Sequence, residues 1–150
     1  MRIAFASDHA GFPQKDILAQ MCRDLGHDVI DLGPATGDVS VDYPDYAFPV
    51  ARAVTEGKAD RGVLVCGTGI GMCIAANKVP GIRAVNITSP EFAGLSREHN
   101  NANVITLSGR FVDVQVNKEI LTTFLTTDFA GGRHQNRLDK VTAQETTERN

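Results

Sequence analysis

The chain has few cysteines, no long hydrophobic run and no excess of positive charge. Its three cysteines form neither a C-x-x-C pair nor the Cys/His spacing of a zinc site, so we expect reduced thiols, no disulfide framework and no metal. No apolar run approaches the length of a membrane span, and the first residues hold only a short apolar run, too short for a signal-peptide core. A cytoplasmic protein without a membrane partner is therefore predicted.

The charge balance is slightly negative, with a formal net charge of −3. This offers no general electrostatic reason to bind nucleic acid, so we expect small-molecule partners. The chain has 150 residues, of which 42% are hydrophobic and 22% charged, values typical of one globular domain. No repeat, low-complexity tract or interdomain linker divides it. We predict a single domain over residues 1–150, with a polar C-terminal tail from about residue 133 that is helical to about Thr147.

Short apolar segments alternate with helical patterns along the chain. The predicted strands are Arg2–Ala6, Asp28–Asp31, Gly62–Val65, Arg83–Ile87 and Val104–Leu107. The buried stripe of the first predicted helix consists of Ile17, Leu18, Met21, Cys22 and Leu25. This alternation predicts an α/β fold, a three-layer α/β/α sandwich around a five-stranded parallel Rossmann-like sheet. Ligands bind such sheets at the carboxyl ends of the strands, where the strand order reverses.

A glycine-rich loop follows the third predicted strand. The sequence GVLVCGTGIGMCIAANK runs from Gly62 to Lys78, and its apolar run ends in Cys66 before three glycines. Such a loop lets main-chain N–H groups converge on an anion, and a helix behind it adds a positive partial charge that also favours a thiolate. The segment therefore offers a base or nucleophile and a cradle for negative charge. A glycine turn beside a buried core cysteine is the alternative that this spacing leaves open.

Two further groups of polar residues stand at predicted strand and helix ends. Asp8 and His9 follow the first strand as Cys66 follows the third, so they converge on one crevice if those strands are neighbours. Asp8 as a helix cap and His9 as a solvated side chain are the alternatives. His99 and Asn100 close a predicted helix, where a histidine can also simply complement the helix dipole.

Arginines near the C-terminus form a candidate phosphate site. Arg133 and Arg137 are four residues apart, so on a helix they share one face and can bind a phosphate with forked hydrogen bonds. Arg110 is a candidate third arm. A solvated basic face is the alternative.

Six motifs together resemble the family of type B ribose-5-phosphate isomerases, which also includes allose-6-phosphate and galactose-6-phosphate isomerases. They occur in order over nearly the whole chain. They are IAFASDHAGF near the start, DYPDYA at 42–47, CGTGIGMCIAANK at 66–78, GIRAV at 81–85, LSREHNNANV at 95–104 and GGRHQNR at 131–137. The resemblance implies a five-stranded parallel sheet and the interconversion of an aldose phosphate and its ketose through an enediolate, without metal or organic cofactor.

The resemblance also implies roles for individual residues. Cys66, as a thiolate, would move the proton between C2 and C1, with Thr68 and the loop amides holding the oxyanion. Asp8 and His99 would open the sugar ring. One branch of the family uses a glutamate of the glycine loop as the base, but the matching position here is Met72, so the resemblance assigns the proton to Cys66. The substrate-binding residues that it implies are His9, Tyr43, Gly67, Gly69, Gly71, Asn100, Arg110, Arg133 and Arg137.

The predicted function is therefore the isomerisation of D-ribose 5-phosphate to D-ribulose 5-phosphate. Allose 6-phosphate, galactose 6-phosphate or a four-carbon sugar phosphate are alternatives, because these residues recognise a phosphate and a hydroxyaldehyde and not a chain length. Sites in the family form between two subunits, so the resemblance implies a homodimer or tetramer with shared sites.

Two other classes of function stay open from the residues alone. A non-catalytic phosphate- or nucleotide-binding module would use the glycine loop and the arginines, although the loop matches neither the P-loop nor the dinucleotide fingerprint. A thiol redox protein would rest on Cys66, but no resolving cysteine stands nearby in a C-x-x-C motif.

Overall fold

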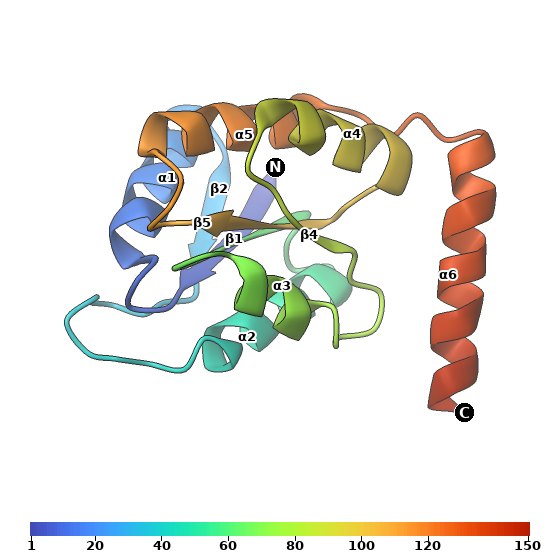
Figure 1. Ribbon diagram of the computed structural model, residues 1–150, viewed down its shortest axis with the longest axis horizontal. Coiled ribbons are helices and arrows are strands. Elements are labelled where there is room, and N and C mark those ends of the chain that lie inside the picture. The colour runs from blue at the N-terminus through green and yellow to red at the C-terminus, as the bar shows by residue number, and fades with distance from the viewer.

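The computed structural model describes every residue from Met1 to Asn150, and its strands and helices alternate as predicted (Figure 1). The elements are β1 (Arg2–Ser7), α1 (Phe12–Asp24), β2 (Asp28–Asp31), α2 (Pro44–Thr55), β3 (Arg61–Cys66), α3 (Ile70–Ala76), β4 (Ala84–Asn86), α4 (Pro90–Asn100), β5 (Val104–Ser108), α5 (Val114–Thr126) and α6 (Arg133–Arg149). None of the helices combines the length and the apolar character that crossing a membrane requires.

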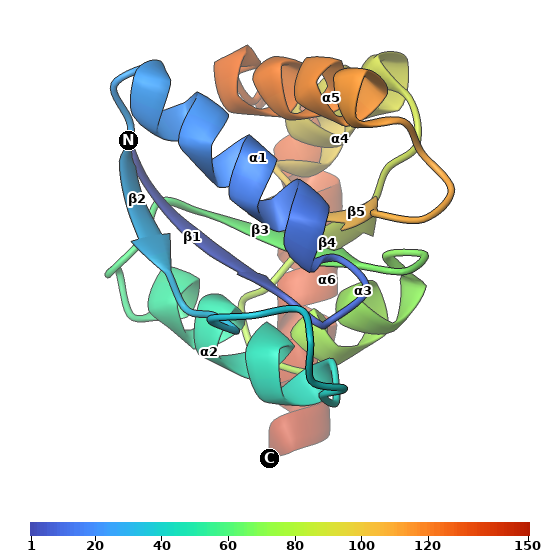
Figure 2. The same cartoon turned by 90° about the vertical axis from the view of Figure 1, so that its left-hand side faces the viewer.

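All five strands are parallel and lie in the order β2-β1-β3-β5-β4. Helices α1, α4 and α5 cover one face of the sheet and α2 and α3 cover the other, which confirms the three-layer architecture (Figure 2). From β1 the chain steps to β2 on one side and then to β3 on the other. The strand order therefore reverses between β1 and β3, and the crevice at their carboxyl ends is where this fold binds ligands.

Strand β3 runs through the middle of the sheet and is buried on both faces. Val63 and Val65 pack into the core beneath α1, α4 and α5, whereas Leu64 and Cys66 pack into the core beneath α2 and α3. An apolar run without alternation is typical of a parallel strand covered on both sides. The side chain of Cys66 therefore belongs to the α2–α3 side of the sheet.

The buried face of α1 differs from the predicted stripe. Leu18 and Cys22 are buried as predicted, but Ile17 is 43% exposed and Leu25 is 58% exposed. Helix α1 instead turns Lys15 toward the core, and this lysine is only 1% exposed. The prediction was wrong there because hydropathy favours apolar side chains at the core, whereas this buried ammonium has an ion-pair partner, Asp31, on the next strand, β2.

Helix α6 lies apart from the three layers, beyond the end of α4 (Figure 1). The polar tail predicted from about residue 133 forms this helix, which extends two residues past the predicted end at Thr147. Leu138 is its only buried residue. Most of the surface of α6 is therefore available to a further binding partner.

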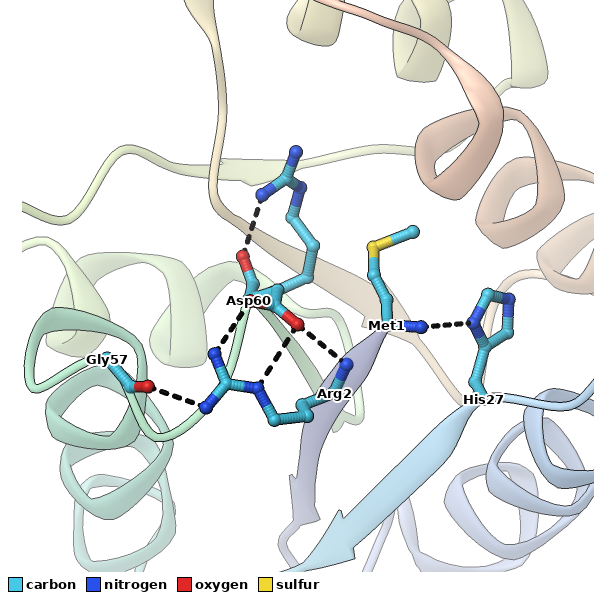
Figure 3. A network of polar contacts seen from close by, with 6 residues as sticks. Met1, Arg2, His27, Gly57 and Asp60 are labelled. Atoms are coloured by element: carbon cyan, nitrogen blue, oxygen red, sulfur yellow. Dashed lines mark hydrogen bonds and ion pairs between the residues drawn. The ribbon is translucent and has the colours of Figure 1, made fainter.

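An ion pair between Arg2 and Asp60 joins β1 to the start of β3 at the amino edge of the sheet (Figure 3). Asp60 accepts hydrogen bonds from the main-chain N–H of Arg2 at 2.7 Å and from its guanidinium at 2.9 Å, and the same guanidinium donates to the carbonyl of Gly57 at 2.8 Å. These bonds from Arg2 lower the pKa of the Asp60 carboxyl from 3.8 to about 2.

This lowered pKa predicts an acid-dependent stability. A carboxyl that binds its proton less tightly in the folded chain stabilises the fold above about pH 4, and the stabilisation is lost as the pH falls through 2. We expect Asp60→Asn to lower the melting temperature by a few degrees at pH 7, because the pair is partly exposed, and to match the wild-type protein near pH 2. Thermal unfolding followed by circular dichroism at both pH values measures this. An equal difference at the two pH values would contradict it.

Candidate active site

The loop between β3 and α3 surrounds the sulfur of Cys66. Cys66 is the last residue of β3 and is 5% exposed. Its Sγ accepts a hydrogen bond from the main-chain N–H of Gly69 at 3.1 Å. Gly69 has a φ of +81°, and a Cβ at this position would collide with the side chain of Asn86, so only glycine fits here. The sulfur thus lies where a main-chain donor can stabilise negative charge.

The loop after β1 packs directly against the end of β3. The N–H of Asp8 donates to the carbonyl of Val65 at 3.2 Å, and the Asp8 carboxylate accepts from the N–H of Gly11 at 2.9 Å. A Cβ on Gly11 would collide with the same Val65 carbonyl, so the main chain at Gly11 and the main chain of β3 lie too close together for any residue except glycine. The first and third strands are neighbours, the condition that the sequence left open, and their pairing brings Asp8 and Cys66 to adjacent strand ends.

Three further predicted residues lie on or against the two loops that follow β1 and β3. The ring of Tyr43 lies against Gly71, since a Cβ there would come within 2.8 Å of the Tyr43 Cζ. The side chain of Arg110 lies against Gly67, and its main-chain N–H donates to the Gly67 carbonyl at 3.1 Å. His9 accepts a hydrogen bond through Nδ1. We call the predicted site residues on these loops, together with those lying against them, the loop cluster. It comprises Asp8, His9, Tyr43, Cys66, Gly67, Thr68, Gly69, Gly71 and Arg110.

A pocket of about 500 Å³ opens beside the loop cluster. Its lining includes Thr68, Phe111 and residues at the start of α5. The Oγ1 of Thr68 accepts from the N–H of Ile70 at 3.1 Å, so its hydroxyl hydrogen is free to point toward a ligand. The chain brings together no group of three His, Cys, Asp or Glu side chains suited to hold a metal ion.

The remaining predicted residues lie at the opposite edge of the sheet. His99 and Asn100 end α4, which returns from the carboxyl edge to the amino edge before β5 begins, and Arg133 and Arg137 lie on α6 beyond it (Figure 1). We call His99, Asn100, Arg133 and Arg137 the α4–α6 cluster. A single copy of the chain therefore does not bring this cluster to Cys66.

His134 belongs beside this cluster and was not predicted. Its ring stacks on that of His99 with 4.4 Å between centroids and 17° between planes. Partial burial lowers the pKa of His134, and His99, Arg133 and Arg137 add to this through their charge. The neutral ring is favoured, so the two imidazoles can stack without repulsion. Its position between the two arginines in GGRHQNR was the signal available in the sequence.

Arg97 was also missed, and it holds the end of α4. Asn101 follows that helix in a left-handed conformation, with φ +46°, which is uncommon for a residue other than glycine. The buried guanidinium of Arg97 donates to the Asn101 side-chain oxygen at 2.9 Å, and Arg83 donates to the Asn101 carbonyl at 2.9 Å. Burial and two neighbouring arginines lower the pKa of Arg97 to about 10. These bonds fix the position of His99 and Asn100, the two residues before Asn101.

Together, the fold and the loop cluster define a doubly wound α/β protein whose thiol, carboxyl and glycine loop meet at the point where the strand order reverses. The sequence model of the Ribose/Galactose Isomerase family matches residues 3–141, and the chain belongs to this family. Its members include sugar-phosphate aldose-ketose isomerases, as the chain's relatives show.

Three relatives are informative. Ribose-5-phosphate isomerase B of Escherichia coli is 44% identical over 96% of this chain and 96% of its own. D-erythrulose-4-phosphate isomerase of Pectobacterium atrosepticum is 39% identical over 94% of this chain and 93% of its own. The crystal structure of ribose-5-phosphate isomerase B from Mycoplasma genitalium with bound ribulose-5-phosphate superimposes with a TM-score of 0.93, at 46% identity over 97% of this chain and 96% of the other.

Proposed function

We propose that this protein interconverts D-ribose 5-phosphate and D-ribulose 5-phosphate, with Cys66 as the base. The observation that carries the proposal is the position of the Cys66 sulfur at the β1/β3 switch point, hydrogen-bonded to the N–H of Gly69 and one strand away from Asp8. The similarity to a ribose-5-phosphate isomerase of Escherichia coli and to a Mycoplasma genitalium enzyme with bound ribulose-5-phosphate supports the choice of substrate.

The proposed chemistry is one proton moved between neighbouring carbons. The Cys66 thiolate takes the proton from C2 of the open-chain aldose, and the electron pair of that bond forms the C1–C2 double bond while the C1 carbonyl oxygen becomes an oxyanion. The hydroxyl proton of the C2 oxygen passes to the C1 oxygen, the thiol returns its proton to C1, and the C2 oxygen, now without a proton, becomes the ketone. Main-chain N–H groups from Gly67 to Gly71, with Thr68, stabilise the oxyanion. Each such donor typically contributes about 3 kcal/mol to transition-state stabilisation.

Ring opening and phosphate binding need both clusters. Asp8 and His99 would transfer the protons that open the sugar ring, with Asn100 beside them. His9 and Arg110 would bind the phosphate from the loop cluster, and Arg133 and Arg137 from the α4–α6 cluster would complete the site.

We therefore propose a homodimer in which the α4–α6 cluster of each copy completes the loop cluster of the other, with a tetramer as two such dimers. A two-fold dimer provides this exchange twice, since each contact is repeated by symmetry. Exposed apolar side chains lie on both parts that would meet. Ile70 and Ile74 of α3, beside the glycine loop, are 54% and 57% exposed, and Val141 of α6 is 60% exposed. A second copy seated between α3 and α6 would cover them.

A panel of sugar phosphates tests the proposed activity. We expect kcat/KM to be highest with ribose 5-phosphate, compared with allose 6-phosphate, galactose 6-phosphate and the four-carbon erythrulose 4-phosphate suggested by the Pectobacterium relative. A rate with allose 6-phosphate far above that with ribose 5-phosphate would overturn the substrate assignment. Exchange of the C2 hydrogen with deuterium from the solvent, followed by NMR, separates an isomerase from a non-catalytic phosphate-binding module.

A further inference from the structure

A buried lysine that the proposed chemistry does not use lies behind the loop cluster. Lys15 of α1 is 1% exposed, and its Nζ lies 3.0 Å from both carboxylate oxygens of Asp31 and donates to the carbonyl of Pro34 at 3.2 Å. The ammonium also lies 4.9 Å from the centre of the Phe12 ring. Burying an ammonium group costs free energy unless the group is paired and hydrogen-bonded. The bonds to Asp31 and Pro34 therefore offset the cost of burying Lys15.

Both residues that accept these hydrogen bonds belong to one stretch of the chain. Pro34 lies near the beginning of the segment 32–43, and Asp31 is the last residue of β2, directly before this segment. We call this segment the site loop. Asp31 accepts a second hydrogen bond from the N–H of Gly33 at 2.9 Å, and the Gly33 carbonyl accepts from the N–H of Ser7 at 3.0 Å. Further along, Gly37 packs against the Phe12 ring. Lys15 thus anchors the start of the site loop to α1, next to the end of β1.

The far end of the site loop contacts the substrate-binding residues. The main-chain N–H of Val41 donates to Nδ1 of His9 at 3.2 Å. A ring nitrogen that accepts a hydrogen bond carries no proton, so the ring proton of His9 resides on Nε2. Two residues later Tyr43 lies against Gly71. The site loop therefore determines which nitrogen of His9 can donate to a ligand.

We propose that Lys15 is a positioning residue for the anionic end of the substrate, acting through the site loop. By anchoring the start of this loop, Lys15 keeps the Val41 amide on Nδ1 of His9, and His9 is thereby held as an Nε2–H donor. The identity of the anion as a sugar phosphate rests on the proposed function. The tautomer of His9 and its dependence on Lys15 are independent of the proposed function.

The test compares Lys15→Met with Lys58→Met in the full-length protein. Methionine fills a similar volume without the charge, and Lys58 is an exposed lysine whose ion pair with Glu56 involves no residue of the site loop. Nitrogen-15 NMR of the imidazoles reports the His9 tautomer, and titration with inorganic phosphate reports anion binding. We expect a single Nε2–H tautomer in the wild-type protein and in Lys58→Met. In Lys15→Met we expect mixed protonation of His9, roughly tenfold weaker phosphate binding and a similar rise in KM with little change in kcat.

Unchanged His9 signals together with an unchanged KM in Lys15→Met would overturn the proposal, as would a wild-type His9 that carries its proton on Nδ1. A pure loss of thermal stability without these changes would mean that Lys15 only supports the fold. A wild-type protein that isomerises no sugar phosphate, but in which Lys15→Met still alters His9 and phosphate binding, would refute the proposed function and leave this proposal standing.

Two variants of His9 keep the test decisive if Lys15→Met fails to fold. Glutamine places an amide N–H near the position of Nε2, whereas asparagine reaches only the position of Nδ1. We expect His9→Gln to bind phosphate within a few-fold of the wild-type protein and His9→Asn to bind about tenfold more weakly. The reverse order would show that Nδ1 is the donor and would exclude the proposal.

Discussion

Replacing Cys66 by alanine is expected to lower kcat with ribose 5-phosphate by about two to four orders of magnitude, the usual contribution of a positioned general base. No other side chain of the loop cluster replaces this base. Asp8 is engaged with the N–H of Gly11, and Met72, the residue that follows the glycine loop, is fully buried and carries no basic group. The fold should survive, because only one sulfur atom is lost from a site at the edge of the core. The measurements are kcat, the exchange of the C2 hydrogen with solvent, and thermal unfolding.

Cys73→Ala is the matched control. Cys73 is a half-buried thiol of the next helix whose Sγ donates to the carbonyl of Ala84 at 3.5 Å, and burial raises its pKa. It should therefore stay protonated at neutral pH, and its replacement should leave kcat within a few-fold of the wild-type value. Rapid C2 exchange in Cys66→Ala would mean that the base is another group. Equal losses in the two variants would point to damage to α3 and not to proton transfer.

The succession of strands and helices along the chain could be predicted from the sequence because it depends on local patterns. Runs of β-branched residues, glycines after helices and the Ser89-Pro90 start of α4 each report on a few neighbouring residues, and Ser89 indeed caps α4 through the N–H of Phe92. The exposure of Ile17 and the burial of Lys15 could not be predicted in this way. Both depend on how α1 is rotated against the sheet, and the rotation is fixed by Asp31 and the site loop, which lie on other elements.

The candidate site shows the same division between local and non-local information. The motifs predicted the individual residues of both clusters, and the strand order, which the sequence pattern does not specify, brought Asp8 next to Cys66. The separation of His99 from Cys66 follows from the fold once the sheet is known to be parallel. A helix between parallel strands must end at the amino edge, so a residue that closes such a helix cannot reach the carboxyl edge of its own sheet. His134 could not be predicted because its stacking partner, His99, lies on another helix. Arg97 could not be predicted because its guanidinium also bonds to the carbonyl of Thr127, thirty residues later in the chain.

Mixing two inactive variants is expected to restore activity if the sites are shared. Cys66→Ala removes the base from the loop cluster, and the double variant Arg133→Ala, Arg137→Ala removes two phosphate contacts from the α4–α6 cluster. The lost contacts should lower kcat/KM of the double variant by about two orders of magnitude or more. When subunits are randomised at equal amounts, half of the dimers contain one copy of each variant. In each such dimer one site combines an intact loop cluster with an intact α4–α6 cluster, so about a quarter of the wild-type activity should return.

A second pair of variants within one cluster provides the control. Cys66→Ala and Arg110→Ala both alter the loop cluster, so every site of a mixed dimer carries one of the two changes whichever copy supplies the α4–α6 cluster. This pair should recover nothing. If each site were instead built from one chain, neither mixture could produce an intact site, and the first pair would stay inactive as well. Recovery confined to the first pair would therefore show both that the protein functions as an assembly and that Arg133 and Arg137 act on the copy opposite their own. That is the arrangement that we propose from the positions of α4 and α6 at the edge of the sheet away from Cys66.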